Sequence, residues 1–203
     1  MHIFALDGHP DIGRLSGALL DAYCEGAQSA GHTITRMALG DMDFDPVLKH
    51  GYRQRQDHEP DLLAALEAIR ACDHFVLGFP MWWGSQPAKL KGFLDRLFLP
   101  GIAFDYVEGK PFPAQLFAGR SAAAFITGET PGWWLSMVYK SPIIHQTRRQ
   151  VLGFCGFKPV KVHYVKLVRN APEADHLPLL QNAKTLGEAA PAPKSPAKKA
   201  ATV

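Results

Sequence analysis

A short segment near the N-terminus, Gly8 to Ser16, is rich in glycine and polar residues. It follows an apolar run and precedes residues with helical spacing, so we expect it to join a strand to a helix. Backbone N–H groups at a helix N-terminus attract anions, and His9, Arg14 and Ser16 add side-chain donors. A phosphate group suits this chemistry. An ordinary loop in which Ser16 caps the helix explains the same residues equally well.

Two further segments combine aromatic rings, glycines and hydroxyl groups. Phe79 to Pro87 places Trp82 beside Trp83, and aromatic rings next to exposed backbone suit a flat ligand with polar edges, such as an isoalloxazine ring. Thr127 to Trp134 has glycines that allow close backbone approach and threonines that offer hydroxyls. From the residues alone, a hydrophobic plug and a plain turn remain alternatives for these two segments.

The three segments each follow a short apolar run that predicts a strand. Strands are expected at 2–6, 32–39, 75–79, 122–127 and 160–167, with helices beginning near Leu15, Pro60, Pro87, Ile144 and Pro172. This alternation predicts an α/β fold with a parallel sheet, helices on both faces and the flavodoxin order 2-1-3-4-5. Because ligands bind at the carboxyl ends of parallel strands, the three segments are expected to meet at one edge of the sheet.

The 203 residues suit a single domain, which we place at 1–188. The formal net charge of +3 comes from the tail at 189–203, which holds three lysines and no acid. The rest of the chain is neutral, which gives no sign of a nucleic-acid-binding face. The tail is dominated by alanine, proline and lysine and is predicted to be disordered.

The three cysteines are odd in number and far apart, which argues against a disulfide framework or a zinc site. Small buried thiols in a reducing compartment are the expected alternative. We see no signal peptide and no apolar stretch near the ~20 residues that a membrane span needs. A cytoplasmic location without a membrane span is therefore predicted.

The central run FPMWWGSQPAKLKGFLDRLFLPGIAFDY, from Phe79 to Tyr106, resembles the signature of the flavodoxin-like NAD(P)H:quinone reductase family. HPD at His9, FDPVL at Phe44, TPGWW at Thr130 and the later LGFCGFKPV are similar to other parts of the family pattern, in order. The resemblance extends to Leu167. It fits the compact bacterial form, which lacks the C-terminal extension of the animal enzymes.

The resemblance implies a non-covalently bound FMN or FAD, and it assigns the contacts. The loop with His9, Arg14, Leu15 and Ser16 would hold the flavin phosphate. The flavin ring would be lined by Pro80, Met81, Trp82 and Trp83. Contacts to its pyrimidine edge would come from Thr127, Gly128, Glu129 and Gly132. No metal site is implied.

The implied reaction passes a hydride from NADPH or NADH through the flavin to a quinone-like acceptor, with ping-pong kinetics. The animal enzymes carry a tyrosine and a histidine after the Thr-Gly loop, whereas this chain has Trp133-Trp134-Leu135 there. Tyr139 and His145 do not align with that pair, so no catalytic side chain is assigned. The alternative within the resemblance is a flavin-bearing regulatory subunit docked on a glutathione-gated potassium efflux transporter.

A long excursion, Leu99 to Leu116, connects the third and fourth predicted strands. It and its surroundings hold several large apolar side chains, more than a solvated loop carries: Ile102, Phe104, Tyr106, Phe112 and Phe117. A homodimer whose interface covers these side chains and completes the site is predicted, as the resemblance also implies. Folding of the excursion back onto its own sheet is the alternative.

Overall fold

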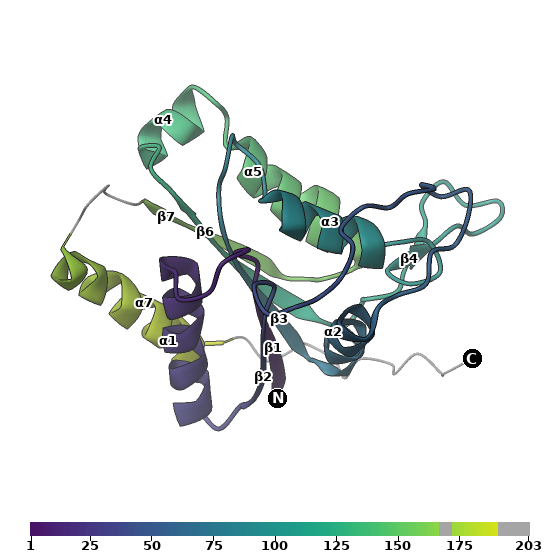
Figure 1. Ribbon diagram of the computed structural model, residues 1–203. Helices are drawn as coiled ribbons and strands as arrows, with labels where there is room; N and C mark the ends of the chain where they lie inside the picture. Colours follow the sequence, from purple (N-terminus) through teal and green to yellow (C-terminus); the bar gives the residue numbers. More distant parts are fainter. Residues whose placement is uncertain (167–171, 191–203) are drawn as a thin grey trace.

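The computed structural model describes residues 1–166 and 172–190. Five parallel strands form one sheet in the order β2-β1-β3-β6-β7 (Figure 1), which confirms the predicted flavodoxin order. The short strands β4 and β5 form a separate hairpin within the excursion. The elements are β1 (His2–Asp7), α1 (Leu15–Ser29), β2 (Thr33–Ala38), α2 (Pro60–Ala71), β3 (His74–Pro80), α3 (Ala88–Leu97), β4 (Phe104–Asp105), β5 (Ala114–Gln115), β6 (Ser121–Gly128), α4 (Gly132–Met137), α5 (Pro142–His145), the π-helix η1 (Gln146–Leu152), α6 (Gly153–Cys155), β7 (Val160–Lys166), the 3₁₀-helix η2 (Glu173–His176) and α7 (Leu177–Glu188).

The sheet separates two hydrophobic clusters, because successive side chains on a strand point to opposite faces. Ile3 and Ala5 of β1 belong to the cluster under α1 and α7. Phe4 and Leu6 belong to the larger cluster under α2, α3 and the helical stretch from α5 to α6. Figure 1 shows these two helical layers on either side of the sheet. The central strands β1 and β3 are buried on both faces, which explains their continuous apolar sequence.

Helices α1 and α7 approach each other closely at two glycines. A Cβ atom added to Gly26 would lie 2.0 Å from the carbonyl oxygen of Lys184, and one added to Gly187 would lie 2.0 Å from that of Tyr23. Contacts at 2.0 Å are far inside van der Waals separation, so any larger residue forces the two backbones apart. The crossing therefore depends on glycine in both helices.

We expect Gly187→Ala to lower the free energy of unfolding by about 1–3 kcal/mol, the usual cost of overpacking, despite the better helix propensity of alanine. The matched control is Asn182→Ala on an exposed position of α7, which we expect to change stability by less than about 0.5 kcal/mol. Urea denaturation measures both. Equal stability of the two variants would contradict the close crossing.

The excursion between α3 and β6 divides its apolar side chains between its own core and the surface. Phe104 and Phe117 are buried in the α2–α3 layer, as the alternative of folding back predicted. Tyr106 and Phe112 remain 72% and 79% exposed. Of the large aromatic side chains for which an external cover was predicted, these two are the exposed ones, and the cover itself stays a prediction.

The three cysteines are free and buried, and burial raises the pKa of each thiol, as expected for inert core residues.

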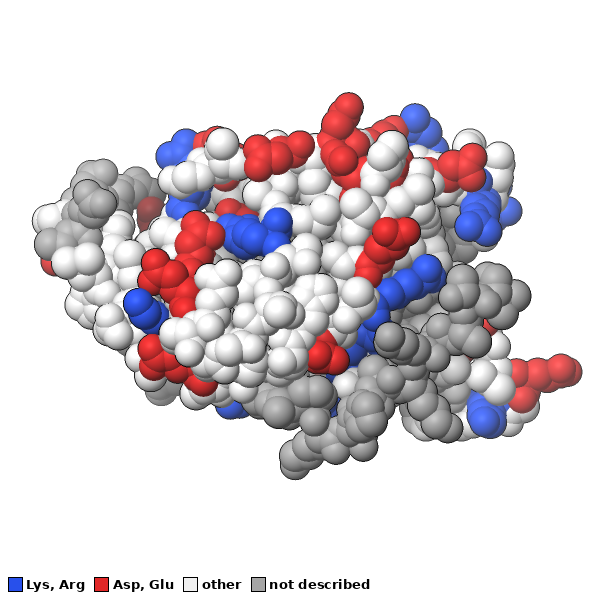
Figure 2. All heavy atoms as spheres, turned by 90° about the horizontal axis from the view of Figure 1, so that it is seen from below, with Lys and Arg blue, Asp and Glu red and all other residues white. Residues whose placement is uncertain are grey.

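Across 1–166 and 172–190, none of the helices has the length and apolar character to cross a membrane. Acidic and basic side chains are interspersed on the face in Figure 2. Leu167 and residues 191–203, most of the predicted tail, lie outside the described residues.

Candidate functional site

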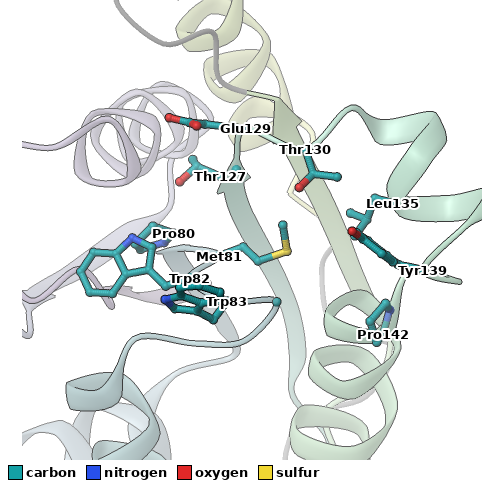
Figure 3. A pocket seen from close by; sticks show the side chains of 12 residues that line it. Pro80, Met81, Trp82, Trp83, Thr127, Glu129, Thr130, Leu135, Tyr139 and Pro142 are labelled. Atoms are coloured by element: carbon teal, nitrogen blue, oxygen red, sulfur yellow. The ribbon is translucent and has the colours of Figure 1, made fainter.

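The three chemistry-bearing segments follow β1, β3 and β6, whose carboxyl ends lie at the same edge of the sheet. Between the last two segments lies a pocket of about 1000 Å³. Figure 3 shows the side chains around it, which come from the end of β3, the end of β6 and the region of α4 and α5. The lining residues are Pro80, Met81, Trp82, Trp83, Gly84, Thr127, Gly128, Glu129, Thr130, Leu135, Tyr139 and Pro142.

The wall that follows β3 is a tight aromatic turn. Met81 N–H donates to the Thr127 carbonyl at 2.7 Å, which ties this segment to β6. Trp82 and Ser85 exchange two backbone hydrogen bonds of 3.0 and 2.9 Å. This turn places Trp83 at its tip with φ of +51° and leaves the side chain fully exposed. A tryptophan with a left-handed backbone conformation and an exposed side chain is energetically unfavourable in the protein alone, which favours a role in contacting a ligand or a partner.

The segment that follows β6 is hydrogen-bonded to Tyr164 of β7. The Tyr164 hydroxyl donates to the Thr130 carbonyl at 2.7 Å, and burial raises the pKa of this tyrosine, so it remains a donor at neutral pH. A Cβ atom at position 128 would lie 2.7 Å from the Tyr164 oxygen. Gly128 is therefore required for β6 and Tyr164 to pack together, and its bare backbone faces the pocket.

The sequence prediction is wrong for the stretch after Thr130, which it made a loop through Trp134. The structure forms the short helix α4 after Pro131, with Leu135 as its one buried residue. This helix and the turn after it bring Leu135, Tyr139 and Pro142 into the pocket lining, which sequence reasoning did not place there. A six-residue helix is too short for apolar periodicity, and only the proline at its start is a usable signal.

The loop after β1 lies beside the pocket and does not line it. The His9 ring meets the Trp82 ring edge-on, with centroids 5.5 Å apart, so the loop and the aromatic turn are in contact. Arg14 pairs with Asp11 on the surface, and this pairing lowers the pKa of Asp11. Ser16 is buried, and its hydroxyl donates to Asp7 at 3.1 Å. Of the predicted site residues, seven line the pocket, while His9, Arg14, Leu15, Ser16 and Gly132 do not.

Glu129 and Tyr139 are the titratable residues in the pocket lining. Among residues 1–166 and 172–190, histidine, cysteine and acidic side chains form no cluster of metal-ligand type. The pocket thus combines aromatic and apolar walls with threonine hydroxyls and glycine backbone. This is the surface that a flat aromatic ring with hydrogen-bonding edges needs, and the volume is sufficient for one.

A doubly wound sheet with a pocket at the carboxyl ends of its strands defines the class of this protein. The chain belongs to the family described as having a flavodoxin-like fold, whose model matches residues 1–188. A mouse ribosyldihydronicotinamide dehydrogenase [quinone] is 25% identical over 178 residues, covering 74% of each chain. An FMN-dependent NADH:quinone oxidoreductase of Rhizobium meliloti is 30% identical over 125 residues, covering 61% of this chain and 58% of the relative. The crystal structure of Smu.1420 from Streptococcus mutans superposes with a TM-score of 0.78 and 25% identity, covering 93% of this chain and all of the other.

Proposed function

We propose that this protein is a flavin-dependent oxidoreductase that transfers electrons from NADPH or NADH to a quinone-like acceptor. The observation that supports it best is the open pocket of about 1000 Å³ between the two segments that the family resemblance assigns to a flavin ring. Family membership and the quinone reductase names of the relatives support the same reaction class. A cytoplasmic location stays a prediction.

The residues present fit a flavin in three respects. Trp82 and Trp83 offer ring surface, and Thr127 offers a hydroxyl at the end of β6. Gly128 exposes backbone where Tyr164 leaves no room for a side chain. The loop from His9 to Ser16, in ring contact with Trp82, would hold the phosphate through backbone N–H groups at the start of α1 and through Arg14. A bound flavin supplies two-electron redox chemistry.

The chain's own contribution is then binding and orientation. The nicotinamide and the acceptor must both reach the same flavin ring in this one pocket, so they would occupy the same place in turn. One shared place predicts ping-pong kinetics, which parallel lines in double-reciprocal plots with varied NAD(P)H and quinone would test. Intersecting lines would show that both substrates bind together and would contradict the shared place.

All four tryptophans, Trp82, Trp83, Trp133 and Trp134, lie in the aromatic turn or in α4. Intrinsic fluorescence therefore reports on this region of the protein. We expect FMN or FAD to quench it in a saturable manner, and the flavin-loaded protein to oxidise NADPH or NADH when a quinone is present. Absence of saturable quenching by FMN, FAD and riboflavin would contradict the proposed function.

Trp83→Ala is expected to weaken flavin binding about tenfold, because stacking on an aromatic ring contributes about 1 kcal/mol or more. The matched control is Trp133→Ala, since Trp133 is also an exposed tryptophan but does not line the pocket. Flavin affinity of the control is expected to stay within twofold of the wild type. Equilibrium titration with free flavin fluorescence as the readout measures both. Equal affinity of the two variants would place the ring elsewhere.

We also propose a homodimer, because the excursion leaves Tyr106 and Phe112 exposed although Phe104 and Phe117 in the same region are buried. An isologous interface would cover both rings. Sedimentation at micromolar concentration is expected to give about twice the 22.3 kDa of one chain. Tyr106→Ser with Phe112→Ser is expected to shift the mass towards one chain. A wild-type mass of one chain, with activity retained on dilution, would contradict the dimer.

A further inference from the structure

The carboxylate of Asp7 is buried inside the loop that would bind the flavin phosphate. Asp7 is the last residue of β1 and is 2% exposed. Its Oδ1 accepts hydrogen bonds from the His9 N–H at 3.0 Å and from the Ser16 hydroxyl at 3.1 Å. These two donors come from the beginning of the loop and from the first turn of α1. A side-chain anion therefore already occupies two donors that the loop could offer to a phosphate.

The surroundings of Asp7 compensate its charge only in part. Arg36 on β2 is the cation that faces it, 3.7 Å from Oδ2, and this guanidinium also donates to Asp21 of α1 at 3.0 Å. The His9 ring is the other titratable group in the loop near it. On the β3 side the paired residue is Gly78, which has no charge.

The absence of a side chain at Gly17 leaves space for the carboxylate of Asp7. A Cβ atom at Gly17 would lie 2.7 Å from Oδ2 of Asp7, so a side chain at residue 17 would force the carboxylate to shift from this position. Burial raises the pKa of Asp7, while the His9 N–H, Arg36 and Ser16 oppose the rise. The group is thus poised to take up a proton more readily than an exposed aspartate does.

We propose that the charge of Asp7 controls how tightly this loop holds the phosphate of the flavin, with tighter binding when the carboxyl is neutral. The proposal rests on the proposed function. A phosphate dianion and an ionised carboxylate in one loop repel each other, and the repulsion is strong where water is excluded. Ionised Asp7 would favour release of the phosphorylated flavin, whereas protonation would favour its retention.

Asp7→Asn tests the charge with little change of shape, since the amide oxygen can still accept from His9 and Ser16. The probes are FMN and riboflavin, which lacks the phosphate, titrated at pH 8 with tryptophan fluorescence as the readout. We expect Asp7→Asn to bind FMN about tenfold or more tightly than the wild type and to bind riboflavin within twofold of it. Unchanged or weaker FMN binding, with riboflavin binding retained, would overturn the proposal.

The matched control is Asp21→Asn, which removes the same charge from an exposed carboxylate that shares Arg36. Its FMN affinity is expected to stay within twofold of the wild type. A gain equal to that of Asp7→Asn would attribute the effect to net charge and overturn the proposal. If wild-type protein bound neither FMN nor riboflavin, the proposed function itself would fail, which is a separate outcome.

A second measurement does not depend on Asp7→Asn folding. In the His9→Asn variant, titration calorimetry at pH 6 in two buffers of different ionisation enthalpy counts the protons exchanged on FMN binding. At pH 6, a phosphate with a second pKa of about 6 releases about half a proton when it binds as a dianion. The proposal expects FMN, relative to riboflavin, to release fewer protons than this or to take protons up, because Asp7 becomes protonated. Release of half a proton or more would overturn it.

Discussion

Arg96→Leu is expected to lower the free energy of unfolding by about 3–5 kcal/mol, the range observed when one partner of a buried ion pair is removed. Arg96 of α3 is completely buried. Its guanidinium donates to both carboxylate oxygens of Glu59, at 3.2 and 2.8 Å, and to the carbonyl oxygens of Asp45 and Asp57. One side chain thus holds three points of the segment between β2 and α2. Leucine removes all of these hydrogen bonds, while the Asp45 N–H still donates to Glu59.

The control for Arg96 is Lys91→Ala on the same helix. Lys91 pairs with Asp95 across one helical turn, and both side chains are about half exposed. An exposed pair of this kind contributes at most about 1 kcal/mol. Urea denaturation of the two variants and the wild type measures the difference. A loss of stability no larger for Arg96→Leu than for Lys91→Ala would show that the buried network is not important for the fold.

Acid is expected to destabilise the protein through His74. This side chain is buried between the Tyr23 hydroxyl, 3.1 Å from Nε2, and the Ser121 hydroxyl, 2.7 Å from Nδ1. Burial first, and then the charges of His32 and Lys161, lower its pKa from 6.5 to about 4. Between these values the unfolded chain binds a proton that the folded protein does not, so stability falls as pH decreases from 6.5 to 4. The shift corresponds to about 3 kcal/mol.

His74→Gln keeps hydrogen-bonding groups but does not titrate. We expect the variant to be less stable than the wild type at pH 7 and to lose about 3 kcal/mol less between pH 6.5 and 4. The difference between variant and wild type isolates His74 from other groups, including His163, whose pKa burial also lowers. His50→Gln, an exposed position, is the control and is expected to follow the wild type. An unchanged pH slope for His74→Gln would contradict the assignment.

Local patterns predicted the elements well because each depends on nearby residues. The apolar runs at β1, β3, β6 and β7 form strands within one or two residues of the expected positions. The helix spacing after Leu15 and Pro87 is confirmed by α1 and α3. The apolar residues of α3 are all buried: Leu90, Phe93, Leu94 and Leu97. The proline-bounded turn with two tryptophans does line the pocket, since its location follows from the end of β3 alone.

Side chains with distant partners could not be predicted in this way. The ammonium of Lys89 on α3 donates to the Met42 carbonyl at 2.8 Å and lies over the Phe44 ring, and neither partner is near Lys89 in the sequence. Arg96 follows Asp95 directly and gives no sequence sign of burial, because its partners are 37 to 51 residues away along the chain. Tyr139 reaches the pocket only because α4 forms.

The sequence by itself determined the order and type of the main strands and helices, the edge of the sheet where the pocket lies, and the aromatic and glycine segments that line it. These follow from short-range periodicity and from the rule that parallel strands share their carboxyl edge. Only the tertiary structure decided which charges are buried, above all Asp7 and Arg96, and that the loop after β1 lies beside the pocket without lining it. Burial and pairing of a charge depend on atoms from several elements at once, and the free energy of a charge depends on that environment more than on its neighbours in the chain.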